Sequence, residues 1–254
     1  VEIARRAAPD KLVALDLGPS GQLMQPYGTL SFDTAYDLYA QQVVAGTAAG
    51  ADLILIETMS DIYEAKAAIL AATENSSLPV LVTVSFQENG RTLTGTDPFT
   101  MVNVIQGLGV QALGINCSLG PKETLPLIKE VLNYSRLPVM AQPNAGMPKV
   151  VAGETIFDVG PKEFGHYARL MAEAGATILG GCCGTNPEHI EALKKELASL
   201  KPRPREVEKV TAVSSATATV VMGRGVNIVG ERINPTGKKP LQEALKSGDN
   251  DYIL

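Results

Sequence analysis

Short apolar segments alternate with amphipathic helical patterns along the first 200 residues. The apolar segments with the length of strands are Leu12–Leu17, Leu53–Glu57, Val80–Phe86, Ala112–Cys117, Pro138–Gln142 and Ile178–Cys182. Their continuous apolar character predicts strands buried on both faces, as in a parallel sheet. The helical patterns are Ser31–Gly50, Asp61–Thr73, Pro121–Tyr134, Pro161–Ala174 and Pro187–Leu200. Because successive strands start about 25–40 residues apart, the sequence predicts an α/β fold of repeated βα units.

Strict alternation of strand and helix favours either a doubly wound sheet or a TIM barrel of the (β/α)8 type. A barrel needs eight strands, so we expect an incomplete one, with six of its eight βα units present and two missing before Val1. After Leu200 a charged, Pro-containing linker is expected at residues 201–225. The strand-like Asn227–Val229 then predicts the first βα unit of a second domain, truncated at residues 226–254. The first domain is accordingly assigned to residues 1–200.

Composition excludes several classes of partner. The 254 residues carry a formal net charge of −5 with no basic patch, so a nucleic-acid partner is not expected. No apolar run approaches about 18 residues, so no membrane span is expected. The N-terminal Val1–Arg6 has no signal-peptide core and is typical of the end of an amphipathic helix. Three cysteines form no disulfide framework, which favours reduced thiols in a cytoplasmic protein.

All three cysteines lie at the C-terminal ends of predicted strands. Cys182 and Cys183 are adjacent within Gly180–Thr185, and Cys117 follows the strand at Ala112. In a parallel α/β fold these ends meet at one edge, where active sites are built. Three thiolates on a tetrahedral zinc ion leave one position open, which is the pattern of a catalytic site.

Two other interpretations of the cysteines remain open. They could be small buried hydrophobic residues. A redox pair is less favoured, because adjacent cysteines close a strained ring and the usual redox spacing is Cys-x-x-Cys. If zinc is bound, its complex with three thiolates carries a charge of −1 and suits a thiol substrate, since a thiol that coordinates zinc loses its proton.

The cysteine segments resemble the zinc motifs of the homocysteine S-methyltransferase family. These segments are Gly114–Ser118 and Gly180–Thr185, and other strand ends that resemble the family are Asp16–Gly21, Glu57–Asp61, Thr94–Asp97 and Gln142–Gly146. The resemblance implies a TIM barrel that binds zinc through Cys117, Cys182 and Cys183, with the homocysteine thiol as fourth ligand. The family's first strand, of the Asp-Gly-Ala-Met-Gly-Thr type, is absent from this sequence.

Three polar residues are candidates for substrate binding. Glu57 ends an apolar strand, where a carboxylate is costly unless it is paired. The resemblance implies that it holds the α-ammonium group of homocysteine, and a helix cap is the alternative. Asn144 could bind the polar end of the amino acid or form a turn, and Asp16 could orient a loop or a ligand. His166 and His189 fall inside predicted helices and are not expected to bind metal.

The C-terminal segment Val229–Gly237 resembles the start of the pterin-binding domain in cobalamin-dependent members of the family. This implies pterin-binding roles for Glu231 and Asn234. It also implies methylcobalamin and 5-methyltetrahydrofolate as cofactors of the full-length protein and a cobalamin-binding module as partner.

The leading hypothesis is zinc-dependent activation of homocysteine for methyl transfer, which forms methionine. One alternative is a stand-alone methyltransferase that uses betaine or S-methylmethionine. Another is a non-catalytic scaffold stabilised by zinc, which predicts four protein ligands.

Overall fold

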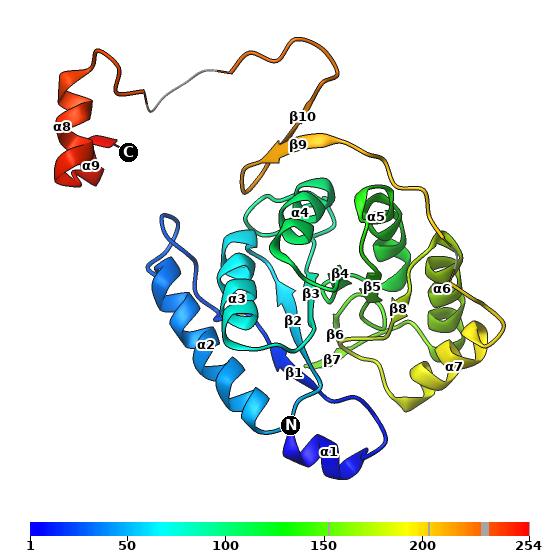
Figure 1. Cartoon of the computed structure of the whole chain (residues 1–254). Coiled ribbons are helices and arrows are strands. Elements are labelled where there is room, and N and C mark those ends of the chain that lie inside the picture. The colour runs from blue at the N-terminus through cyan, green and yellow to red at the C-terminus, as the bar shows by residue number, and fades with distance from the viewer. Residues whose placement is uncertain (152, 203, 230–233, 254) are drawn as a thin grey trace. The chain divides into compact units, whose positions relative to one another are not determined.

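The computed structural model describes residues 1–151, 153–202, 204–229 and 234–253. The chain divides into two compact units, Val1–Val220 and Val221–Leu254, which are described separately. The first unit contains a six-stranded parallel sheet (Figure 1). Its strands are β1 (Ala14–Leu17), β2 (Leu53–Met59), β3 (Val80–Val84), β4 (Ala112–Asn116), β5 (Val139–Gln142) and β8 (Ile178–Leu179).

The order of the strands decides between the two predicted architectures. The sheet runs β1-β2-β3-β4-β5-β8, and each strand pairs in parallel with the next. A doubly wound sheet reverses its strand order, whereas this sheet never does. Crossovers of a single hand then place every connecting helix on the same side, as the ring of helices in Figure 1 shows. The fold is a partial TIM barrel of six parallel strands, as the sequence predicts.

The connecting helices follow the strands in chain order. They are α2 (Phe32–Ala48), α3 (Ile62–Asn75), α4 (Pro98–Ile105), α5 (Pro121–Tyr134), α6 (Pro161–Ala174) and α7 (Pro187–Leu197), with the short α1 (Glu2–Ala7) before β1 and the 3-10 helix η1 (Gln106–Leu108) after α4. Ser31 caps α2 by accepting a hydrogen bond from the Thr34 N–H, as expected. Proline occupies the first turn of α5, α6 and α7, where a missing N–H does no harm.

The two faces of the sheet differ in burial. Residues that face the helices are fully buried and form the main core, among them Ile54, Ile56, Val82, Val84, Leu113 and Ile115. Burial on the other face is uneven, because Leu55, Leu81 and Ile178 are only partly buried while Thr83, Ala112 and Asn116 are buried. The predicted burial on both faces is therefore complete only on the helix side. The core lies between sheet and helices, and the inner face carries the polar strand ends.

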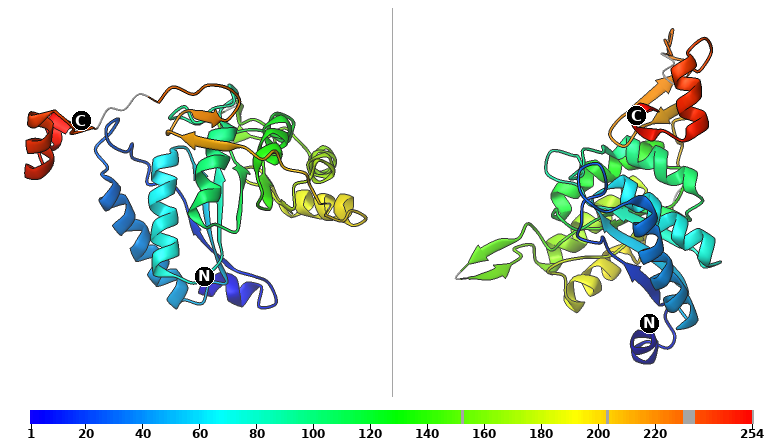
Figure 2. Two further views of the ribbon diagram at one scale, coloured as in Figure 1. Left: turned by 45° about the horizontal axis from the view of Figure 1, so that its top comes forward. Right: turned by 90° about the vertical axis from the view of Figure 1, so that its left-hand side faces the viewer.

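Two hairpins were not predicted. β6 (Lys149–Val151) and β7 (Glu154–Ile156) pair in antiparallel fashion and project from the unit between β5 and α6 (Figure 2). β9 (Thr211–Ser214) and β10 (Thr219–Met222) form a second small sheet. Each of these strands has only three or four residues.

Most of the predicted linker at residues 201–225 belongs to the first unit, which extends to Val220. Arg205 donates hydrogen bonds to the carbonyl oxygens of Leu132 (2.7 Å) and Leu137 (3.0 Å). Further along, Asn103 of α4 bonds to Ser214 at 2.8 Å. This segment is thus attached to the outside of the barrel by specific polar contacts.

The second unit contains α8 (Lys239–Ser247) and α9 (Asn250–Ile253). The predicted strand Asn227–Val229 is not formed. Val226 and Ile228 are more than nine-tenths exposed. A strand needs a neighbour to satisfy its N–H and C=O groups, and these residues pair with none in the described part of the chain.

A buried carboxylate anchors the loop that follows β1. Glu64 of α3 is 2% exposed and accepts hydrogen bonds from the Ser20 N–H (2.7 Å) and the Tyr39 hydroxyl (2.8 Å). The Tyr39 oxygen also lies 3.1 Å from the carbonyl oxygen of Gly18. The loop beginning at Asp16 is therefore tied to α2 and α3.

Replacing Tyr39 with Phe is expected to lower the free energy of unfolding by about 1–3 kcal/mol, because the buried Glu64 carboxylate loses a donor. Burial raises the pKa of Tyr39, so in the wild type the unfolded state ionises first and stability falls as pH rises above about 10. Urea unfolding from pH 7 to 11 measures both effects. The difference in unfolding free energy between the wild type and Tyr39→Phe should shrink at high pH, because only the wild type loses stability through ionisation of Tyr39.

Tyr36→Phe is the matched control, since the Tyr36 hydroxyl bonds to Glu74 at the surface. Its expected cost is within about 0.5 kcal/mol. Equal costs for the two variants would show that the Tyr39–Glu64 contact does not anchor the loop.

Candidate metal centre

The three cysteines converge at the C-terminal edge of the sheet. Cys117 directly follows β4, and Cys182 and Cys183 follow β8. Their Sγ atoms all lie within 4.8 Å of one another. The Cys117–Cys183 separation is 3.8 Å and the Cys182–Cys183 separation is 3.9 Å. Cys183 is exposed, and the other two are partly buried.

The loop after β5 connects the two cysteine segments. It does so through main-chain hydrogen bonds and one side chain: Cys117 N to Gln142 O (3.1 Å), Cys182 N to Pro143 O (3.0 Å), Ala145 N to Cys183 O (2.9 Å) and Cys183 N to Asn144 Oδ1 (3.0 Å). The cysteine positions are therefore fixed by backbone pairing across strands that are distant in sequence.

The backbone is strained at this edge. Among the described residues other than glycine, a positive φ occurs only at Thr58 (62°), Cys117 (60°) and Ser118 (58°). Such conformations cost energy for residues with a Cβ and gather at functional sites. At Gly184, with φ of 76°, an added Cβ would clash with the Phe157 ring. This glycine lets the chain turn directly after the cysteine pair.

The sulfur spacing fits a zinc ion. A tetrahedral site with Zn–S bonds of about 2.3 Å separates its sulfur atoms by about 3.8 Å, which matches the Sγ separations of 3.8 Å for Cys117–Cys183 and 3.9 Å for Cys182–Cys183. Thiolates are also the donors that zinc prefers. In the described part of the chain no histidine or carboxylate joins the three sulfurs, so the protein supplies three such donors to a four-coordinate ion.

The three thiols influence one another's pKa values. A hydrogen bond from the Cys182 thiol lowers the pKa of Cys117 to about 5. The same bond raises the pKa of Cys182. Burial, followed by the negative charge of Cys117, raises the pKa of Cys183. These shifts favour a thiolate at Cys117 and protonated thiols at Cys182 and Cys183, so a divalent cation that binds all three sulfurs must displace the remaining protons.

The three candidate substrate residues lie around this cluster. Glu57 of β2 is partly buried. Its pKa is raised first by this burial and then by the charges of Asp16 and Cys117. Asp16 of β1 is exposed. Asn144 is 3% exposed, bonds to the Cys183 N–H, and its side chain also bonds to Cys117. The inner edge thus carries an excess of negative charge that a cationic group would relieve.

Asn116 was missed as a separate site residue. It is fully buried at the end of β4, and its side chain reaches Glu57, Thr58 and Cys182. The signal in the sequence is a polar amide inside an otherwise apolar strand, directly before a cysteine.

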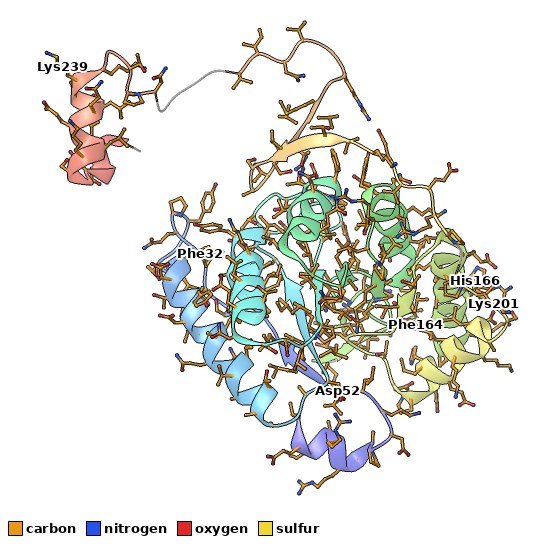
Figure 3. All side chains as sticks on the ribbon, viewed as in Figure 1. Phe32, Asp52, Phe164, His166, Lys201 and Lys239 are labelled. Atoms are coloured by element: carbon orange, nitrogen blue, oxygen red, sulfur yellow. The ribbon has the colours of Figure 1, made fainter. Side chains whose placement is uncertain are left out.

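Both histidines lie within helices, as predicted, and neither belongs to the cysteine cluster. His166 of α6 is exposed at the outer side of the barrel (Figure 3). His189 is 6% exposed and completes the capping box of α7 with Asn186, while its Nε2 lies 2.9 Å from the Val159 carbonyl oxygen. Its ring packs edge-on against Phe164, with centroids 5.4 Å apart.

The two predicted pterin-binding residues belong to the second unit. Glu231 lies outside the described residues. The side-chain oxygen of Asn234 accepts a hydrogen bond from the Thr236 N–H at 2.9 Å, which closes a local turn.

Comparison with known proteins agrees with this geometry. A sequence profile described as homocysteine S-methyltransferase matches residues 1–197. The chain belongs to the homocysteine S-methyltransferase family. Methionine synthase of Mycobacterium tuberculosis is 31% identical over 267 residues, and that of Mycobacterium leprae is 31% identical over 272 residues. Each alignment covers 99% of this chain and 22% of the relative, so the chain spans about a fifth of their length.

A solved structure of the family has the same fold. The metallated form of the homocysteine methyltransferase MmuM from Escherichia coli superposes with a TM-score of 0.61 at 25% identity, over 76% of this chain and 65% of that one. The apo form gives a TM-score of 0.60 at 25% identity, over 77% and 67%. The predicted family and the predicted barrel-type fold are both confirmed.

Among the described residues no helix is long and apolar enough to cross a membrane.

Replacing any one of Cys117, Cys182 and Cys183 with Ala is expected to remove most of the bound zinc, because two thiolates hold the ion far less tightly than three. Metal analysis after dialysis measures the zinc content. Ser118→Gly is the control, since it removes an exposed hydroxyl at a positive φ that glycine tolerates. Full zinc retention by Cys183→Ala would mean that the ligand set is wrong.

Proposed function

We propose that this chain activates the thiol of homocysteine for methyl transfer, which forms methionine. The observation that carries the proposal is the cysteine cluster, in which three sulfurs with the spacing of a zinc site leave a fourth position for substrate. A closed structural site would have four protein ligands.

Cys117, Cys182 and Cys183 would hold the zinc ion, with Asn144 and the backbone of the β5 loop fixing their positions. A bound zinc ion supplies a positive charge that lowers the pKa of a substrate thiol, so that the sulfur is a nucleophile near neutral pH. Three thiolates reduce the Lewis acidity of the ion, which favours a thiol over a carbonyl substrate.

The polar end of homocysteine would bind beside the cluster. Glu57 is the proposed partner of the α-ammonium group, because its carboxylate is partly buried beside other negative charges and has no cationic partner among the described ion pairs. Asp16 adds negative charge nearby. Asn144, held between Cys117 and Cys183, is assigned to the polar end of the substrate.

Methylcobalamin, brought by a cobalamin-binding module of the full-length protein, is the proposed methyl donor, and 5-methyltetrahydrofolate would regenerate it. The alignment with methionine synthases supports this choice, since it covers 99% of the chain and extends past the family match at residue 197. We assign residues 1–200 to the homocysteine domain, 201–225 to a linker and 226–254 to the start of the pterin-binding domain, with Glu231 and Asn234 as pterin-binding residues.

The free cysteines fit a reducing compartment, and we propose a cytoplasmic location. A stand-alone methyltransferase that uses betaine or S-methylmethionine is the second candidate, since MmuM is described as a homocysteine methyltransferase and resembles 77% of this chain.

The test offers homocysteine to the intact protein with methylcobalamin, betaine or S-methylmethionine and measures methionine. Methionine is expected with methylcobalamin and with neither of the other two donors. The activity should disappear when a chelator is added and return when zinc is added back. Homoserine, which has a hydroxyl in place of the thiol, is the substrate control and should not be methylated. Turnover with betaine or S-methylmethionine would favour the second candidate, and no turnover with any donor would favour a scaffold.

Glu57→Gln is expected to raise the KM for homocysteine about 10- to 100-fold, because a charged hydrogen bond to the ammonium is worth about 1.5–3 kcal/mol. The kcat should change little, since this contact is made equally in the ground and transition states. Steady-state kinetics measure both constants. Glu130→Gln on α5, whose pKa is also raised by burial, is the control. An unchanged KM in Glu57→Gln would exclude the ammonium role.

A further inference from the structure

Asn116 is a fully buried amide whose hydrogen bonds all go to the edge of the sheet that carries the cysteines. Its Oδ1 accepts from Thr58 N (2.7 Å) and Thr83 Oγ1 (2.8 Å), and its Nδ2 faces Thr58 Oγ1 (2.8 Å), Glu57 Oε2 (3.4 Å) and Cys182 Sγ (3.9 Å). The Asn116 side chain thus contacts residues of β2 and β3 and the cysteine Cys182, which follows β8.

The orientation of the amide follows from its partners. The Thr58 N–H can only donate, so the atom that faces it must be the oxygen of Asn116. The NH2 group therefore points towards Glu57 and Cys182, both of which accept hydrogen bonds when ionised.

The acceptor side of Asn116 holds an unusual backbone turn. Thr58 has φ of 62°, a costly conformation for a β-branched residue. The pairing of β2 with β3 shifts register between Ile56 and Met59, so that Glu57 and Thr58 lie in an irregular part of the strand. Two hydrogen bonds between Asn116 and Thr58, one to its N–H and one to its hydroxyl, stabilise that turn.

The donor side lies between a proposed substrate contact and a proposed metal ligand. The NH2 group is 3.4 Å from the Glu57 carboxylate and 3.9 Å from the Cys182 sulfur. A zinc-bound Cys182 would be a thiolate and an ionised Glu57 a carboxylate, and hydrogen bonds to charged groups are the stronger kind. Partners of metal ligands orient those ligands and tune their affinity for the ion.

We propose that Asn116 is a positioning residue. Its NH2 group fixes the position of the Glu57 carboxylate relative to the Cys182 sulfur, and so fixes the position of the ammonium site relative to the metal site. This inference rests on the proposed function, since it assumes that Glu57 binds substrate and that Cys182 binds zinc. Asn116 acts through these two side chains and through the Thr58 turn.

Asn116→Asp is the sharpest test, because it has the same shape and keeps the acceptor for Thr58 N and Thr83 Oγ1. It replaces the NH2 group with an oxygen that repels Glu57 and the cysteine thiolates. In the intact protein the zinc dissociation constant, measured by chelator competition, should rise about 10- to 100-fold. The KM for homocysteine at saturating zinc should also rise about tenfold or more, with a smaller change in kcat.

Two further variants separate positioning from stability. Ser135→Ala removes an equally buried hydroxyl that bonds to Leu137 O at 3.0 Å, at the end of α5. It should lower the melting temperature of the zinc-free protein and leave the zinc affinity and the KM unchanged. Thr83→Val removes one bond to Oδ1 and should raise the KM severalfold, which keeps the test valid if Asn116→Asp does not fold.

The proposal would be overturned if Asn116→Asp had the zinc affinity and the KM of the wild type. If Asn116→Asp does not fold, a wild-type KM in Thr83→Val would overturn it. This result is distinct from failure of the proposed function, in which the wild type itself would bind no zinc or form no methionine.

Discussion

Strand β5 lies between the two strands that lead to the cysteines, and this constraint shapes the whole site. Neighbouring strands are about 4.8 Å apart, so β4 and β8 are separated by about 10 Å, yet Cys117 and Cys183 bring their sulfurs to 3.8 Å. The chain must therefore turn over the end of β5 from both sides. The positive φ angles at Cys117 and Ser118 and the glycine after Cys183 are the local cost of that approach.

The close approach of the three cysteine sulfurs also concentrates negative charge at this edge of the sheet. The hydrogen bond with Cys117 raises the pKa of Cys182, and burial followed by the charge of Cys117 raises the pKa of Cys183. Burial, followed by the charges of Asp16 and Cys117, raises the pKa of Glu57 at the same edge. A divalent cation relieves the repulsion among the thiolates, and the ammonium group of an amino acid would relieve that at Glu57. The substrate proposed for this site carries both a thiol and an ammonium group, so its two ends match the two places where the protein accumulates charge.

The sequence was sufficient for features that depend on local pattern. Continuous apolar segments located all six strands of the main sheet, and parallel pairing alone implied that cysteines 65 residues apart, Cys117 and Cys182, would meet. Features that depend on distant partners could not be read in this way. The amide of Asn116 contacts residues 58 and 66 positions away, which no local spacing reveals. Asn227–Val229 has the pattern of a strand and forms none, because its state depends on a pairing partner.

The proposed function requires that the three thiols form an open zinc site that accepts a substrate thiol. Zinc K-edge X-ray absorption of the intact, zinc-loaded protein tests it most directly, because it counts the sulfur atoms around the metal. The count should be about three without homocysteine and about four with it. Four sulfurs before substrate is added, or none at any stage, would rule out an open site of three thiolates.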